Sequence, residues 1–234
     1  MRRQATGFTL IEIAIVLVII GLLLGGVLKG QELITGARVR NLISQQDGAK
    51  AAFFGFQDRY RALPGDYASA STNINCPNAP SATCINGNGN GQIESAAAGG
   101  GTTREHLLTW THLTAAGFLN GSYNMAAADT APLDTNSPKN PYSIFLTMIY
   151  DDDYGVGTLS PKHNLKTGNQ IPVEILAEVD RKVDDGQPYG GSFQYSTFVP
   201  GGTALTPADC IVPGPPATWF IRTPSSNCGG ASLF

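Results

Sequence analysis

Glu12 is the residue whose position most clearly implies chemistry, because its carboxylate interrupts an apolar run. The run covers the 21 residues from Phe8 to Leu28, and from Ile13 onward it contains no polar side chain. A charged group that deep in hydrocarbon costs a few kcal/mol, so such residues are usually functional. The alternative is a glutamate that reaches the membrane surface near the start of a helix. Glu12 is therefore the first candidate functional residue.

A second group of polar residues has the spacing of metal ligands. Amide oxygens stand at alternate positions in Asn86, Asn88 and Asn90. This spacing matches the first half of a calcium-binding loop. The match is incomplete, because the twelfth position is Ala97 instead of glutamate, although Glu94 occupies the ninth. Calcium would need further carboxylates, for example from Asp151 to Asp153 or from Asp184 and Asp185, and a cluster of Asn-Gly turns is the favoured alternative.

The four cysteines form two local pairs, Cys76 with Cys84 and Cys210 with Cys228. An even number of cysteines in an exported domain predicts disulfide bonds. Reduced and buried thiols are the alternative interpretation. A zinc site is not indicated, because the tight C-x-x-C spacing of such sites is absent from the sequence.

Other residue patterns do not indicate catalysis or nucleic-acid binding. His106 and His112 are six residues apart and so point to different faces of a helix. No serine or cysteine stands in a nucleophile motif such as G-x-S-x-G, so we expect no enzyme. The formal charge is -3 with 14% charged residues, which gives no basic footprint. We therefore expect no nucleic-acid partner.

The apolar run is long enough to cross a bilayer, since 21 helical residues span about 30 Å. Arg2 and Arg3 precede it, and positive residues favour the cytoplasmic side. A secretory signal would have a shorter apolar region followed by a small-residue cleavage site, whereas this run ends in Leu28-Lys29-Gly30. We expect a single span with a cytoplasmic N-terminus.

The junction Gly7-Phe8-Thr9-Leu10-Ile11-Glu12 resembles the processing signature of type IV pilins and type II secretion pseudopilins. The resemblance implies that prepilin peptidase cleaves between Gly7 and Phe8 and that Phe8 is then N-methylated. It also implies that Glu12 pairs with the new terminal amine of a neighbouring subunit, so that two charges costly in lipid neutralise each other.

The chain divides by composition into four parts. Residues 1–7 form the leader, residues 8–30 the transmembrane and polymerisation helix, and residues 31–63 an amphipathic continuation of that helix, which Pro64 ends. Residues 64–234 form an extracytoplasmic globule with disulfide-bounded loops.

Within the globule, residues 68–101 have the composition of a loop. Thr102 to Glu105 resemble a capping box that opens a helix reaching Gly117. A second helix is expected from Pro172 to Val183, and strands at 142–149, 192–199 and 219–223. The predicted fold class is α+β, with the long N-terminal helix packed on a small antiparallel sheet, and the resemblance to pilins implies the same.

These features predict a structural subunit, a pilin or minor pilin of a type IV pilus-like filament. The expected partners are other pilin subunits, prepilin peptidase and an inner-membrane assembly platform. We expect the protein to lie in the bacterial inner membrane before assembly, and in an extracytoplasmic filament or on the cell surface afterwards. One alternative is a type II secretion pseudopilin. The cysteine-bounded C-terminal loop resembles that of type IV pilins and therefore favours a pilin over this alternative. The other is an adhesin or DNA-uptake module on the same helix.

Overall fold

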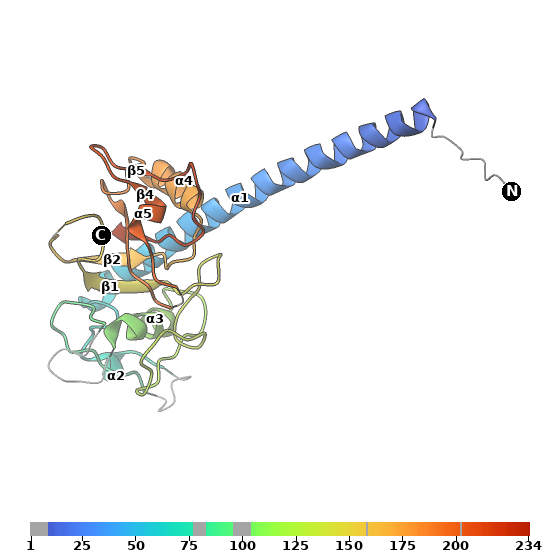
Figure 1. Ribbon diagram of the computed structural model, residues 1–234. Coiled ribbons are helices and arrows are strands. Elements are labelled where there is room, and N and C mark those ends of the chain that lie inside the picture. Colours follow the sequence, from blue (N-terminus) through green and yellow to red (C-terminus); the bar gives the residue numbers. More distant parts are fainter. Residues whose placement is uncertain (1–8, 77–82, 96–103, 158, 202) are drawn as a thin grey trace. The chain divides into compact units, whose positions relative to one another are not determined.

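The computed structural model describes residues 9–76, 83–95, 104–157, 159–201 and 203–234 (Figure 1). The chain divides into two compact units, one that ends at Arg38 and one that extends from Val39 to Phe234. Helix α1, Leu10–Tyr60, contributes to both units. The remaining helices and strands lie in the second unit.

The C-terminal half of α1 is amphipathic, as the three-or-four spacing of its apolar residues predicts. The side chains that it buries are Val39, Leu42, Gln46, Ala49, Ala52, Phe53 and Phe56. The helix ends at Tyr60, three residues before the expected end of the amphipathic segment at residue 63. Arg61 follows with a left-handed φ of 53°, and Pro64 then prevents the helix from continuing.

A four-stranded antiparallel sheet forms the centre of the second unit. Its strand order is β1-β2-β6-β3, so the C-terminal strand lies inside the sheet. The strands are β1 Thr147–Asp151, β2 Lys162–Lys166, β3 Phe193–Tyr195 and β6 Gly230–Leu233. Together with α1 this sheet confirms the predicted α+β class.

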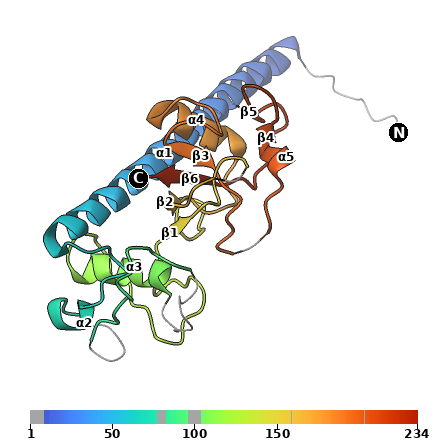
Figure 2. The same cartoon turned by 90° about the vertical axis from the view of Figure 1, so that its left-hand side faces the viewer.

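The described residues of the unit also form four shorter helices and a two-stranded sheet. They are α2 Ala70–Asn73, α3 Glu105–Ala115, α4 Val173–Val183, α5 Pro207–Cys210, β4 Ile211–Val212 and β5 Thr218–Trp219. Figures 1 and 2 show α2 and α3 at one end of the unit and α4 with β4 and β5 at the other. Each end has its own core: Phe53 and Trp110 belong to the first, and Leu42, Val179 and Trp219 to the second.

Several predicted boundaries were wrong. The strand expected at 142–149 begins only at Thr147, because the Asn140 side chain accepts hydrogen bonds from the backbone of Tyr142 and Ile144 and holds that segment in a turn. The strand expected at 192–199 is limited to β3, and the one expected at 219–223 to β5. The expected loop at 68–101 contains α2, in which Asn73 donates a backbone hydrogen bond to Ser69.

Two strands of the central sheet have no counterpart among the predictions. Strand β2 has the sequence KHNLK, which lacks β-branched residues, and β6 has the sequence GASL. Gly230 opens β6 at a point where a Cβ atom would overlap the ring of Phe193 on the neighbouring strand. The close approach of the strands therefore requires glycine there, and strand propensity does not reveal it.

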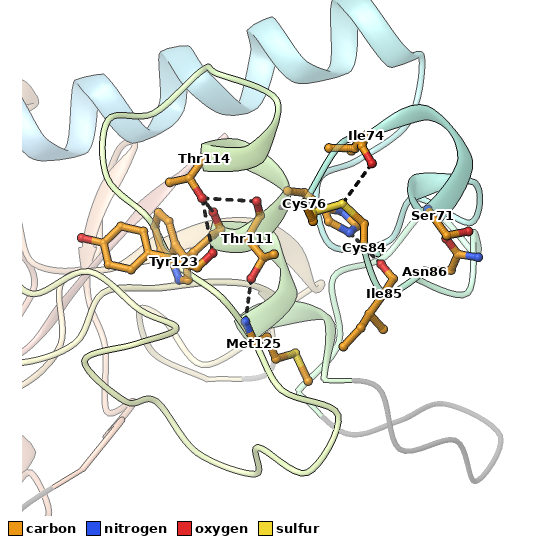
Figure 3. The surroundings of a disulfide bond; sticks show 12 residues. Ser71, Ile74, Cys76, Cys84, Ile85, Asn86, Thr111, Thr114, Tyr123 and Met125 are labelled. Atoms are coloured by element: carbon orange, nitrogen blue, oxygen red, sulfur yellow. Dashed lines mark hydrogen bonds between the residues drawn. A yellow bond between two sulfur atoms is a disulfide. The ribbon is translucent and has the colours of Figure 1, made fainter. Parts of the chain in front are cut away.

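The structure contains two disulfides, Cys76–Cys84 and Cys210–Cys228, with Cα–Cα distances of 5.2 and 5.8 Å. All four cysteines are buried. Figure 3 shows the first bond beside α3, where Cys84 Sγ lies 3.4 Å from the carbonyl oxygen of Ile74. Closure of the longer loop, between residues 210 and 228, stabilises the fold by about 3 kcal/mol on a chain-entropy estimate.

Candidate functional site

The first unit presents apolar side chains without protein cover. Leu10 is 88% exposed and Leu22 is 73% exposed. By length and composition α1 can cross a membrane: an eighteen-residue stretch has a mean hydropathy of 2.8, and none of it is buried within the protein. Such a surface is not stable in water and implies lipid or other helices around it.

Glu12 lies in the first turn of α1, where it forms a capping box with Thr9. One carboxylate oxygen, Oε2, accepts hydrogen bonds from the backbone N–H and from the hydroxyl of Thr9, each at 2.8 Å. The Glu12 N–H in turn donates to the Thr9 hydroxyl at 3.4 Å. These reciprocal bonds satisfy donors that a helix start leaves free. Gly7 and Phe8, between which cleavage is predicted, lie outside the described residues.

The Asn-Gly run of residues 86–91 folds around the carboxylate of Asp66. Oδ1 of Asp66 accepts the backbone N–H groups of Gly89 at 2.6 Å and Asn90 at 3.0 Å, and Oδ2 accepts that of Gly91 at 2.8 Å. Gly89 and Gly91 have left-handed φ angles of 76° and 84°, which turn successive N–H groups toward one side. Burial raises the pKa of Asp66 although these donors oppose the rise. The run is therefore a concave loop of N–H groups with an acidic side chain at its centre.

The three amide oxygens predicted as calcium ligands each accept a backbone hydrogen bond. Asn86 Oδ1 accepts from Ser71 at 2.7 Å (Figure 3), Asn88 Oδ1 from Asn90 at 2.9 Å and Asn90 Oδ1 from Gln92 at 2.9 Å. The amide nitrogens of Asn88 and Asn90 both donate to Glu94 Oε2. The last two oxygens form Asx turns, which is the conformation that the alternative interpretation predicts. Calcium binding by this run remains a prediction.

Glu105 opens α3 and closes the same loop from the other side. Its carboxylate accepts the N–H of Asn88 at 2.8 Å and that of Glu94 at 3.3 Å. Burial raises its pKa to about 7. The predicted capping box was wrong, because the residue before the helix is Arg104, which forms no side-chain cap. Glu105 thus binds a neighbouring loop and not its own helix start; Thr102 and Thr103 lie outside the described residues.

His112 on α3 joins two further segments. Its Nδ1 accepts the N–H of Gly65 at 3.0 Å, so the proton is on Nε2, which donates to the carbonyl of Ile85 at 2.9 Å. The ring stacks on Phe56 of α1 at an interplanar angle of 8°. Burial lowers its pKa to about 4. His112 therefore requires the neutral imidazole, and it has a structural role that its sequence spacing did not reveal.

His106, the other histidine of this helix, also has a backbone partner. Its Nδ1 lies 3.2 Å from the carbonyl oxygen of Glu94, and burial lowers its pKa to about 4. Both histidines thus hold loops, and neither is directed at the other.

The acidic run 151–153 surrounds a buried lysine. Lys166 of β2 is 1% exposed, and its ammonium lies 2.8 Å from Asp151 Oδ1. The ammonium also donates to the carbonyl of Asp153 and to the hydroxyl of Ser196. Burial lowers the lysine pKa, and the aspartates oppose that shift. This segment therefore neutralises a charge in the sheet, whereas Asp184 and Asp185 gather with Asp180 at the end of α4.

Comparison with known protein families identifies one sequence motif in the chain. Residues 2–28 match the prokaryotic N-terminal methylation motif, the signature of type IV pilins and pseudopilins. No curated protein and no solved structure matched the chain. The matched segment contains Gly7, Phe8 and Glu12 and overlaps the apolar part of α1.

Proposed function

We propose that this chain is a pilin or minor pilin, a structural subunit of a type IV pilus-like filament. In this proposal prepilin peptidase cleaves between Gly7 and Phe8, Phe8 is N-methylated, and the subunits assemble through the apolar part of α1. The other partners are further pilin subunits and an inner-membrane assembly platform. The chain is anchored in the inner membrane before assembly and is exposed on an extracytoplasmic filament afterwards.

One observation carries this proposal: the methylation motif lies directly on a helix whose apolar surface has no protein cover. A membrane anchor alone accounts for the apolar surface. It does not account for a carboxylate at Glu12 or for the glycine and phenylalanine that precede it in the motif. A helix that passes from lipid into a filament core accounts for all of these features.

Cleavage supplies the positive charge that Glu12 needs. It removes Arg2 and Arg3 together with the leader, and it leaves an ammonium group on Phe8. We infer that this ammonium pairs with Glu12 of an adjacent subunit, because two charges in lipid cost far less as a pair than alone. Within the subunit, Thr9 provides hydrogen bonds to Glu12 but no charge. The carboxylate is thus partly compensated before assembly and fully compensated after it.

The disulfide Cys210–Cys228 favours a pilin over a type II secretion pseudopilin. It closes a loop near the C-terminus, as in the type IV pilins that this region resembles.

Processing can be tested in membranes by expression of the full chain with and without a prepilin peptidase. We expect a shortening by the seven leader residues only when the peptidase is present. Gly7→Val should prevent it, because a bulky residue then stands at the scissile bond, and Gln4→Ala in the same leader should not. Equal shortening of the Gly7→Val chain, or none in the natural chain, would contradict the proposal.

A further inference from the structure

Three carboxylates meet where α4 ends. Asp180, Asp184 and Asp185 each place one carboxylate oxygen within 4.8 Å of the others. Asp180 lies in the last turn of α4 and Asp184 is the residue that caps its C-terminus, while Asp185 begins the turn that leads to β3. They stand at the negative end of the helix dipole, where a further negative charge is unfavourable. Arg181 and Lys182 of the same turn both pair with Glu178.

Hydrogen bonds to Oδ2 orient the carboxylates of Asp180 and Asp184, and a hydrogen bond to Oδ1 orients that of Asp185. Oδ2 of Asp180 accepts the indole N–H of Trp219 at 2.7 Å. Oδ2 of Asp184 accepts the N–H of Ser192 and, at 3.0 Å, that of Phe193. Oδ1 of Asp185 accepts the N–H of Gln187 at 2.8 Å. Donors that fix one oxygen and leave the other for a ligand are typical of carboxylates that bind metal ions.

Asp180 provides the strongest indication of a missing partner. The residue is 0% exposed, and its Oδ1 is a buried oxygen with no hydrogen-bond partner among the described residues. A buried, unsatisfied carboxylate oxygen costs several kcal/mol unless a cation or a proton compensates it.

We propose that Asp180, Asp184 and Asp185 form a calcium site. All candidate ligands are carboxylate oxygens, which hard cations prefer, and calcium accepts the irregular geometry of a helix end and a turn. A pocket of about 400 Å³, lined by Asp185, Gly186 and Trp219 among others, opens beside the cluster and admits the water ligands that three carboxylates leave vacant. The ion would fasten α4 to β3 and to β5, which carries Trp219.

This site is distinct from the Asn-Gly run, and it does not depend on the proposed function. The run folds around Asp66 and is bonded to Glu105 of α3, whereas Asp180 belongs to α4. Figures 1 and 2 show α3 and α4 at opposite ends of the unit. The full chain in detergent micelles, stripped with a chelator, can be titrated with calcium chloride by calorimetry. Terbium luminescence on tryptophan excitation gives a second readout, because Trp219 bonds directly to Asp180.

We expect one saturable calcium site and terbium luminescence that calcium displaces. Asp185→Asn changes an exposed ligand and should preserve the fold while weakening calcium at least about tenfold. Asp180→Asn should also weaken calcium binding at least about tenfold, as measured on the folded variant. Glu174→Gln is the matched control, because Glu174 lines the same pocket outside the cluster. The absence of saturable binding, or binding unchanged in Asp185→Asn, would overturn the site, as would loss of binding in Asn90→Ala.

Discussion

Oε2 of Glu12 accepts two hydrogen bonds from Thr9, one from its backbone N–H and one from its hydroxyl, both at 2.8 Å. The carboxylate at the start of α1 is therefore hydrogen-bonded within its own subunit but receives no positive charge from Thr9. Hydrogen bonding and charge pairing at Glu12 can thus be separated by substitution.

Glu12→Gln retains an oxygen for Thr9 but removes the charge, and Glu12→Ala removes both. We expect both variants to insert into the membrane normally, because the apolar run is unchanged. Incorporation into sheared filaments should fall at least about tenfold in both, since removal of one member of a buried ion pair costs about 3 kcal/mol or more. Thr9→Val is the control, because it loses the two hydrogen bonds of the Thr9 hydroxyl but leaves the charge of Glu12 and the backbone bond from Thr9 in place. Normal incorporation of Glu12→Gln would show that charge pairing is not required.

Asp66 offers a test of how the Asn-Gly run is held. Asp66→Ala removes the acceptor of three backbone N–H groups, those of Gly89, Asn90 and Gly91. We expect amide hydrogen exchange to accelerate most at Gly91, while the amides of β1 remain protected. The acceleration should be smaller at Gly89 and Asn90, whose N–H groups keep the Asp66 carbonyl and Asn88 Oδ1 as acceptors. Asp58→Ala, an exposed acidic residue near the end of α1, is the control. Unchanged exchange at the three amides would mean that the Asp66 carboxylate does not hold the loop.

The lowered pKa of His112 predicts that the protein loses stability in acid. The pKa of His112 falls from an ordinary value of 6.5 to about 4 on folding, so the unfolded chain binds more protons between these values. The free energy of unfolding contributed by His112 is complete above pH 6.5 and decreases as the pH falls toward 4, by about 3 kcal/mol. His106 changes in the same direction, whereas Glu105, whose pKa rises to about 7, stabilises the fold as the pH falls from 7 to 4.5.

The contribution of His112 can be isolated by comparison with His112→Gln, which keeps one donor and one acceptor but does not titrate. Urea unfolding at several pH values should show a smaller dependence between pH 6.5 and 4 in this variant. An unchanged dependence would rule out His112 as a source of acid sensitivity.

The Lys166–Asp151 pair predicts unequal effects of two substitutions. Asp151→Asn leaves the buried ammonium without its carboxylate and should lower the free energy of unfolding by about 3 kcal/mol. Lys166→Met replaces the ammonium by an apolar group of similar length and leaves Asp151, which is 20% exposed, in contact with water. Its effect on urea unfolding should be smaller. The reverse order would mean that packing of the lysine chain outweighs its charge.

The elements that sequence predicts best are those whose evidence is local. Helix α1 follows from the long apolar run and from the amphipathic spacing that continues it. Helix α4 follows from Ile175, Leu176, Val179 and Val183 at helical spacing. The cysteine pairs follow because each lies within one short segment.

What sequence did not predict depends on contacts between distant segments. Asp66 meets residues more than twenty positions away, and the burial of Lys166 is caused by β1 and by Ser196. Strand β6 is defined by its position between β2 and β3 and not by its residues. Neither hydrophobic periodicity nor turn composition contains this information, because both are properties of neighbouring residues.

The central claim, that this chain is processed and then assembled, is tested most directly by mass spectrometry of the chain recovered from sheared filaments. We predict a mature chain that begins at Phe8 and carries one methyl group on its terminal nitrogen. A filament-derived chain that begins at any other residue, or that retains residues 1–7, would contradict the account.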